Sequence, residues 1–262
     1  MKHAFAILRW PYEALVTVVG FLYFGTGGIL FTVVGALAHL ASQSHANKLR
    51  GRRAVSAAFR SFLGLLRLSG LIRLDLAALD ALRAERGLVI APNHPGLLDA
   101  VLVMSRVPDV ACILKAGLLQ SPFLGGGARW SGHISNDSGS GMVRASAAEL
   151  RAGGQLLVFP EGTRTRGPLG ALNAFKGGVA LIAREAQAPV QTVLLRPNTT
   201  FLGKTWPWLR KPTFPLVFRA ELGRRFDPPA KGADVKPWVA ELEAYFRSEL
   251  GNTGKSTGRT PE

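Results

Sequence analysis

The chain contains almost none of the residues that build disulfides or typical metal sites. Cys112 is the single cysteine among 262 residues, so no disulfide can form within the chain, which suits a reducing compartment. Because Cys112 lies in an apolar run, we expect it in the core rather than as a nucleophile. The five histidines show no ligand spacing, so the sequence predicts neither a metal site nor a bound cofactor. Of His3, His39, His45 and His133, only His133, near Asp137, is a candidate contributor to a polar site.

Acidic residues are also scarce. The chain has 17 Asp and Glu against 32 Lys and Arg, which gives a formal net charge of +15. Such a basic chain favours a partner of negative charge, either nucleic acid or an anionic membrane. The first 70 residues hold eight basic residues and one acid, Glu13, beside an apolar segment. Because no nucleic-acid recognition motif accompanies this charge, its distribution favours anionic membrane lipids over nucleic acid as partners.

The apolar segment carries no charged side chain between Ala14 and Leu40. Its length is sufficient for one helix across a bilayer, but the run at residues 25–28, Gly-Thr-Gly-Gly, interrupts it. Each remaining arm is too short to cross alone, so the segment forms either one imperfect spanning helix or a hairpin of two short helices embedded in one leaflet. We favour the hairpin, with a soluble core helix as the remaining alternative. A cleaved signal peptide fits less well, because the apolar part is too long.

Residues 53–67 have the period of an amphipathic helix. The apolar side of this helix is formed by Val55, Phe59, Phe62, Leu63 and Leu66, and the basic stripe beside it by Arg53, Arg60 and Arg67. The helix lies in the membrane interface with its arginines toward lipid phosphates, packs on the rest of the chain with the arginines solvated, or does both. The basic run at residues 48–53 predicts that this end faces the cytoplasm. Residues 206–208, Trp-Pro-Trp, indicate either an interfacial anchor or a loop that covers a sheet edge.

The remainder of the chain predicts one α/β domain, a mixed sheet flanked by helices. Strand candidates occur at residues 88–91, 110–114, 155–159, 190–195 and 216–220. Helical patterns occur at residues 142–152, 178–187 and 235–250, the last of them capped by Asp234. We therefore predict three parts: membrane-binding helices at residues 1–70, an α/β domain at residues 71–250 and a disordered polar tail at residues 251–262.

A histidine and an acidic residue follow the first strand candidate of this domain. His94 and Asp99 lie in a turn-forming run, residues 92–99, directly after the apolar residues 88–91. A histidine can accept a proton near neutral pH, and a nearby carboxylate can fix its tautomer and stabilise the imidazolium. Open α/β sheets place their chemistry at such strand ends. The pair is therefore a candidate catalytic dyad.

A second polar turn follows the strand candidate at residues 155–159. Residues 160–167 offer a carboxylate, hydroxyl groups, backbone amides and the guanidinium groups of Arg164 and Arg166. Arginine is suited to phosphate because its planar fork donates paired hydrogen bonds. Lys176 then precedes the helix at residues 178–187, and a helix N-terminus beside a lysine also favours an anion. If the two turns converge, they form one site for a phosphate-bearing substrate.

These motifs resemble those of the glycerophospholipid acyltransferases, whose best-known members make phosphatidic acid from lysophosphatidic acid. Asn93, His94 and Asp99 match the first family motif, Asn-His-x4-Asp. Residues 159–164, Phe-Pro-Glu-Gly-Thr-Arg, match the third motif in full, and residues 175–178 match its Phe-Lys-x-Gly continuation. The resemblance covers residues 88–197 and implies an α/β fold.

The resemblance also implies a role for each motif residue. His94 takes the proton of an acceptor hydroxyl that attacks an acyl thioester, and Asp99 holds the imidazole ring. The implied substrate contacts are Lys115, Glu161, Gly162, Thr163, Arg164 and Lys176, with Asn93 and Asp137 as supporting residues. Glu161 either anchors the substrate or braces its own turn. The family further implies acyl-CoA or acyl carrier protein as donor, a lysophospholipid as acceptor, and a membrane location with the active site on the cytoplasmic face. The oligomeric state stays open.

The second family motif fits less well. Asp137 falls on the family aspartate, but Ser138 stands where the family has an arginine that contacts the head group. Arg129 or Arg144 could replace that arginine. Because Ser138 replaces the family arginine, the chain could catalyse the same acyl transfer to another acceptor, such as an ornithine-type or glycolipid hydroxyl. A non-catalytic lipid-binding protein is the second alternative, although such a protein needs no base and acid pair.

Overall fold

The computed structural model describes residues 2–137, 139–207 and 210–251. Ser138, Trp208 and the tail at residues 252–262 lie outside the described residues, so the predictions made for them are not examined further. The helices are α1 (Lys2–Ala41), α2 (His45–Leu68), the 3-10 helix η1 (Ala77–Leu82), α3 (Asp99–Arg106), α4 (Ala116–Leu119), α5 (Gly125–Trp130), α6 (Ser140–Arg151), α7 (Gly178–Ala186) and α8 (Lys236–Gly251). Asp234 caps α8 as predicted, since its Oδ1 accepts a hydrogen bond from the Lys236 N–H at 3.0 Å.

Seven strands form one mixed sheet, which confirms the predicted fold class. The strands are β1 (Ile72–Asp75), β2 (Leu88–Pro92), β3 (Val110–Leu114), β4 (Ile134–Ser135), β5 (Gln155–Leu157), β6 (Val190–Pro197) and β7 (Leu216–Phe226). Their order across the sheet is β1-β7-β6-β2-β5-β3-β4, and only the β6–β7 pair is antiparallel among the described pairs. Strands β1 and β4 and helix α3 were not predicted from the sequence. The central strands β2, β5 and β3 are parallel, so their carboxyl ends meet at one edge.

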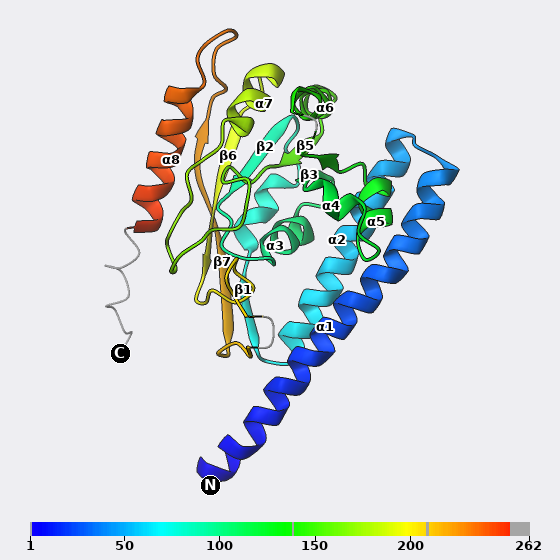
Figure 1. Cartoon of the computed structure of the whole chain (residues 1–262), viewed down its shortest axis with the longest axis vertical. Coiled ribbons are helices and arrows are strands. Elements are labelled where there is room, and N and C mark those ends of the chain that lie inside the picture. Colours follow the sequence, from blue (N-terminus) through cyan, green and yellow to red (C-terminus); the bar gives the residue numbers. More distant parts are fainter. Residues whose placement is uncertain (1, 138, 208–209, 252–262) are drawn as a thin grey trace.

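The central strands are apolar on both faces because helices cover both faces. In β2, Leu88 and Ile90 pack in one hydrophobic cluster, while Val89 and Ala91 pack in the other. Residues of α2 and α3 share the first cluster, and residues of α7 and α8 share the second. Successive side chains of a strand point to opposite faces, so this arrangement requires an uninterrupted apolar run. Figure 1 shows α8 on one side of the sheet and the α1–α2 pair on the other.

The predicted break in the N-terminal apolar segment is wrong. Helix α1 continues without interruption through residues 25–28, and the chain turns only after Ala41. A hairpin does form, but its second arm is α2, which returns alongside α1 (Figure 1). Within the described residues α1 is the one helix long and apolar enough to cross a membrane, by length and composition, over residues 9–41.

The glycines of α1 serve close packing instead of a turn. A Cβ atom at Gly28 would lie 2.8 Å from the carbonyl oxygen of Phe123. A Cβ atom at Gly35 would lie 2.7 Å from the backbone nitrogen of Gly127, in α5. Two backbones can approach this closely only where side chains are absent, as in helix pairs built on small residues. The contact joins α1 to the α/β domain through the backbone of the Gly125–Gly127 run.

Helix α2 packs on the domain through both its apolar and its basic residues. Val55, Phe62 and Leu63 are buried in the core cluster shared with α3. Arg53 forms an ion pair with Asp109, with Nε 2.8 Å from Oδ1. The structure therefore shows α2 packed on the domain, and Arg53 and Arg60 have protein partners where solvated arginines were expected.

Arg52 lies in the middle of the basic run and is almost completely buried, with 1% of its side chain exposed. Its Nε donates to the carbonyl oxygen of Ser131 at 2.9 Å, and its Nη1 lies 2.6 Å from Oε1 of Glu149 in α6. The sequence places this arginine among exposed basic residues, yet the structure uses it to connect α2 with α5 and α6. A paired and hydrogen-bonded guanidinium is one of the few charged groups that a core accepts.

Candidate active site

The two polar turns converge because their strands are neighbours. Strand β2 ends just before His94, β5 ends just before Phe159, and β3 ends just before Lys115. These three parallel strands lie in the order β2-β5-β3, so their carboxyl ends open into one cleft. The cleft has a volume of about 440 Å³. The candidate residues that line it are His94, Lys115, Gly162, Thr163, Arg164 and Lys176.

His94 and Asp99 form the predicted pair at this cleft. The Nδ1 atom of His94 lies 2.8 Å from Oδ2 of Asp99, at the start of α3. The same oxygen accepts the backbone N–H of Gly96 at 2.7 Å. A carboxylate at Nδ1 favours the tautomer that carries its proton there, which leaves Nε2 free to accept a proton. The His94 ring also stacks on Phe159, with ring centroids 3.9 Å apart, so the third motif helps to orient the first.

Asp99 lies behind the histidine, away from solvent. Its side chain is 1% exposed, whereas that of His94 is 17% exposed. Burial raises the pKa of Asp99, and the hydrogen bond from His94 acts in the opposite direction. The carboxylate therefore depends on the imidazole for its stability as an ion, and the two groups act as one unit.

Glu161 is buried beneath the cleft and does not line it. One carboxylate oxygen accepts the backbone N–H of His94 at 2.9 Å, and the other accepts the backbone N–H of Asn173 at 2.9 Å. The hydroxyl of Thr165 lies 2.8 Å from both oxygens. The Thr165 N–H donates in turn to the carbonyl oxygen of His94 at 2.7 Å. Glu161 thus ties the His94 loop to the second turn, which matches the bracing alternative for this residue.

Asn93 holds the histidine loop to the neighbouring strand. Its Nδ2 donates to the carbonyl oxygen of Leu195 at 2.9 Å, and its Oδ1 accepts the Leu195 N–H at 2.7 Å. Both bonds are buried and continue the β2–β6 ladder one residue beyond Pro92, which has no N–H to donate. Asn93 therefore positions the first residue of the loop without reaching the cleft.

The second turn presents its basic residues around a glycine. Gly162 has a φ of 65°, and a Cβ atom there would lie 2.8 Å from Cδ of Lys176. The absence of a side chain at Gly162 thus allows the lysine stem to cross the turn. Arg164 donates through Nη1 to the carbonyl oxygens of Leu202, at 2.9 Å, and Gly203, at 3.3 Å. Arg164 is thereby fixed against the loop that follows β6.

That loop brings in a lysine that the sequence analysis missed. The pKa of Lys204 is lowered chiefly by the positive charge of Lys115. Burial and the positive charges of Arg164 and Arg166 lower it further. Lys204 therefore lies within the electrostatic field of the cations at the cleft, two of which, Lys115 and Arg164, line it. Lys204 belongs to no motif, and its sequence neighbours give no signal. Only the contact of the residue 202–203 carbonyls with Arg164 reveals its place.

Three other candidates lie apart from the cleft. Asp137 is exposed after β4 and does not line the cleft. Arg129 donates to the carbonyl oxygen of Leu119 and supports the α4–α5 segment. His133 accepts the Cys112 backbone N–H at 3.2 Å, and burial, with the charge of Arg52, lowers its pKa to about 3. A neutral histidine that bonds to a strand supports the sheet and does not transfer protons. Among the described residues, no group of three or more His, Cys, Asp or Glu is placed to hold a metal ion.

Cys112 gives a direct test of the interior of this site. It is buried in β3, and burial raises the pKa of its thiol to about 12. The thiol therefore stays neutral at pH 8, and only the thiolate is reactive. We expect no labelling of the folded chain by iodoacetamide at pH 8 and complete labelling after denaturation, measured by intact mass. Rapid labelling of the folded chain would contradict the buried position.

Comparison of the sequence with known proteins identifies a family and two named relatives. A family model described as Acyltransferase matches residues 73–196. The 1-acyl-sn-glycerol-3-phosphate acyltransferase of Helicobacter pylori is 32% identical over 113 residues, 41% of this chain and 47% of that protein, so the match spans about half of that relative. The enzyme of the same name from Pseudomonas aeruginosa is 25% identical over 199 residues, 71% of this chain and 74% of that protein.

A solved structure matches along the full length of the chain. It is the 1-acyl-sn-glycerophosphate (LPA) acyltransferase PlsC from Thermotoga maritima, with a TM-score of 0.59, 19% identity and 100% of each chain covered. At this identity the likeness concerns the fold, which includes the order of helices and strands described above. The family model spans both strand ends where His94 and Arg164 lie.

Proposed function

This chain is a member of the glycerophospholipid acyltransferase family, and we propose that it transfers a fatty acyl group from a thioester donor to the free hydroxyl of 1-acyl-glycerol-3-phosphate. The observation that carries the proposal is the 2.8 Å contact between His94 and Asp99 at the mouth of a cleft rich in cations. A base and a phosphate-binding surface at one opening are what this reaction requires. The names of the two bacterial relatives support the acceptor.

The geometry supports a mechanism with a single general base. Nε2 of His94 accepts the acceptor hydroxyl proton as that oxygen forms a bond to the acyl carbon. The thioester carbonyl becomes a tetrahedral oxyanion, which the backbone amides and cations of the second turn are suited to stabilise. The intermediate collapses with cleavage of the carbon–sulfur bond, and His94 returns its proton to the leaving thiolate. Asp99 stabilises the imidazolium throughout, and no protein nucleophile takes part.

The cations of the cleft are suited to the acceptor phosphate. Lys115 and Arg164 line the cleft, and Lys204 follows Leu202 and Gly203, whose carbonyl oxygens accept hydrogen bonds from Arg164. These three cations supply the positive charge that the family arginine would provide at position 138, where this chain has a serine. Lysine and arginine side chains both bind phosphate oxygens through charge-assisted hydrogen bonds. We propose that the head group lies among these three residues.

The donor and the location of the reaction form part of the same proposal. Acyl-CoA and acyl carrier protein both present a thioester from water, and the open cleft admits either. The exposed apolar surface of α1 and the net charge of +15 support binding to anionic membrane lipids. The basic residues 48–53 support a cytoplasmic position of the cleft, although Arg52 itself is buried.

One assay tests the proposed function. The full-length chain, purified in mild detergent, is incubated with labelled acyl-CoA or acyl carrier protein and a panel of lysolipids, and the products are identified by mass spectrometry. We expect acylated product from lysophosphatidic acid. Transfer only to an ornithine-type or glycolipid acceptor would change the acceptor and keep the chemistry. Binding without any product would identify a lipid-binding protein.

Substitution of Lys204 tests its place in the head-group site. We expect Lys204→Ala to raise KM for lysophosphatidic acid about tenfold while kcat changes little, since one charge-assisted hydrogen bond to phosphate is lost. Lys236→Ala, an exposed lysine at the start of α8 that does not line the cleft, is the matched control. The two variants are compared by acylation rates at several acceptor concentrations. Equal KM values for wild type and Lys204→Ala would exclude this lysine from the site.

A further inference from the structure

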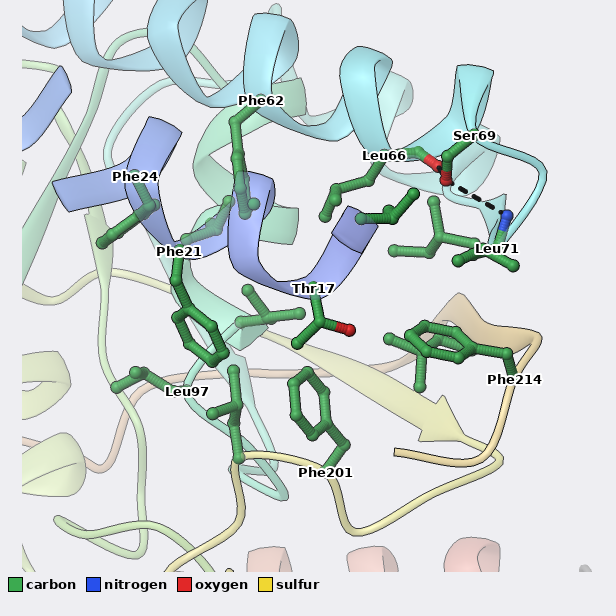
Figure 2. Close-up of a pocket in the computed structure, with 17 residues that line it drawn as sticks. Thr17, Phe21, Phe24, Phe62, Leu66, Ser69, Leu71, Leu97, Phe201 and Phe214 are labelled. Carbon is green, nitrogen blue, oxygen red and sulfur yellow. Dashed lines mark hydrogen bonds between the residues drawn. The ribbon is translucent and has the colours of Figure 1, made fainter. Parts of the chain in front are cut away.

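We propose that a second, narrow cavity between the helical hairpin and the α/β domain holds the acyl tail of the acceptor lipid. The inference rests on the proposed O-acyl transfer and adds a binding site to it. Figure 2 shows the cavity, with side chains of α1 and α2 on one side and Leu97, Phe201 and Phe214 on the other. Its walls are made almost entirely of apolar side chains.

The few polar side chains at the cavity are satisfied by the protein itself. The hydroxyl of Thr17 donates to the carbonyl oxygen of Glu13 at 2.7 Å, within α1. The hydroxyl of Ser69 donates to the carbonyl oxygen of Leu66 at 2.6 Å and accepts the N–H of Leu71 (Figure 2). The space between them therefore offers a ligand no strong polar partner. An alkyl chain is the ligand that fits best, because it gives up no hydrogen bonds to water when it enters.

The shape of the cavity also fits an alkyl chain. The cavity has a volume of about 90 Å³, against about 440 Å³ for the active-site cleft. Seventeen residues line this small volume, so the space between them is a narrow slot. Such a slot admits a hydrocarbon chain and excludes a compact, hydrated head group.

The slot reaches the catalytic motif itself. Leu97 and Leu98, which stand between His94 and Asp99 in the chain, both line it. Leu97 also lines the active-site cleft, so one side chain separates the two spaces. A glycerol hydroxyl near His94 would therefore lie close to the mouth of the slot. The carbonyl of Leu202, another lining residue, accepts the N–H of Leu97 at 3.1 Å and the guanidinium of Arg164, which connects the slot with the head-group cations.

The position of the slot favours the acceptor over the donor. The reaction brings two acyl chains to His94, and the donor chain arrives on a water-soluble carrier. The slot lies instead behind α1, whose outer side exposes apolar side chains at Leu15, Val18 and Leu22. A lysolipid that leaves a bilayer thus has to pass only one helix. The main cleft has an apolar wall of its own, formed by Met142, Val179 and Ile182, which is available to the donor chain.

The slot is held open by polar contacts at its end. Glu13 of α1 pairs with Arg9, at 2.7 Å, and with Lys211 of the loop that carries Phe214. The hydroxyl of Tyr12 donates to the carbonyl oxygen of Ser69 at 2.7 Å, which fixes α1 to the end of α2. These contacts hold both walls at a set separation. The slot is consequently a fixed feature that can select for chain length.

A chain-length experiment tests the proposal. Thr17→Phe fills the slot, so we expect the rate with an 18-carbon lysophosphatidic acid to fall about tenfold relative to a 10-carbon one, at a constant donor. Phe201→Ala widens the slot and is expected to shift the same ratio toward long chains. Val18→Phe adds a ring to the neighbouring exposed residue of α1 and should leave the ratio within about twofold of wild type. An unchanged ratio in Thr17→Phe, or a change in donor preference alone, would overturn the assignment.

A labelling experiment on the unmodified chain is independent of turnover. Lysophosphatidic acid with a diazirine near the end of its tail is irradiated with the full-length chain in detergent, and the labelled peptides are identified by mass spectrometry. We expect label at residues 16–24 and 201–216, reduced by excess unlabelled lipid. Label confined to the wall of the main cleft would reject the proposal. If the wild type forms no product with any acceptor, the proposed function fails, while this label still decides whether the slot binds the tail.

Discussion

His94→Ala is expected to lower kcat for acyl transfer by about a thousandfold, because general-base catalysis by a positioned side chain contributes a factor of this order. His94 is the one cleft residue paired with a buried carboxylate, at 2.8 Å from Asp99. Among the described residues that line the cleft, the other polar side chains are the cations Lys115, Arg164 and Lys176, an amide, a hydroxyl and a buried thiol, and none of them replaces an imidazole as a base. The measurement is the initial rate of product formation with lysophosphatidic acid and a saturating donor, followed by mass spectrometry.

The control for this variant is an exposed histidine. His45, at the start of α2, makes no contact with the cleft, and His45→Ala should retain the wild-type rate. Both variants should still sediment with vesicles that contain anionic lipid, because α1 is unaltered. Asp99→Asn should lose activity to a similar degree, since an amide can no longer stabilise the imidazolium. Substantial turnover by His94→Ala would rule out the single-base mechanism.

Arg52→Met is expected to destabilise the fold by about 3–5 kcal/mol, the usual cost of removing one partner from a buried ion pair. The substitution leaves Glu149 without its partner at 2.6 Å and the carbonyl of Ser131 without a donor. Because Arg52 connects α2 with α5 and α6, the hairpin should also separate more readily from the domain. Urea unfolding in detergent, followed by circular dichroism, gives the change in free energy.

The neighbouring arginine provides a matched comparison. Arg53 forms a similar ion pair with Asp109, but 64% of its side chain is exposed. Exposed pairs contribute less than about 1 kcal/mol, so Arg53→Met should change the unfolding free energy little. If the two variants lose equal stability, burial of Arg52 cannot be the source of its contribution.

The α/β domain could be predicted because its signals are local. An apolar run in the sequence predicts strand β2, and the polar turn at the end of this strand contains His94. The turn with His94 and the turn with Arg164 lie together because β2 and β5 are neighbours in the sheet. The presence of both family motifs in the chain made this arrangement predictable. The roles of individual side chains were less accessible. Glu161 is an acidic residue of a family motif, so the sequence suggested a substrate contact. Its actual position under the turn, where it accepts hydrogen bonds from His94 and Asn173, depends on how two loops pack.

The errors concern contacts between residues far apart in the chain. Gly25–Gly28 predicts a break when only the local backbone is considered, because glycine weakens helices. In the structure Gly28 faces Phe123, almost a hundred residues away, and the helix continues. The burial of Arg52, within the basic run at residues 48–53, could not be predicted for the same reason, since its partner Glu149 is equally distant in sequence. Lys204 escaped notice because nothing but the folded loop relates it to Lys115.

The backbone contact between Gly35 and Gly127 has a consequence for how the protein would work on a bilayer. Side chains can yield when two helices shift, but touching backbones leave no such freedom, so α1 and the catalytic cleft move as one body. The immersion depth of α1 would then set the height of the imidazole above the lipid surface. A thinner or thicker bilayer should alter the rate on embedded lysolipid while the rate on dispersed, short-chain substrate stays constant.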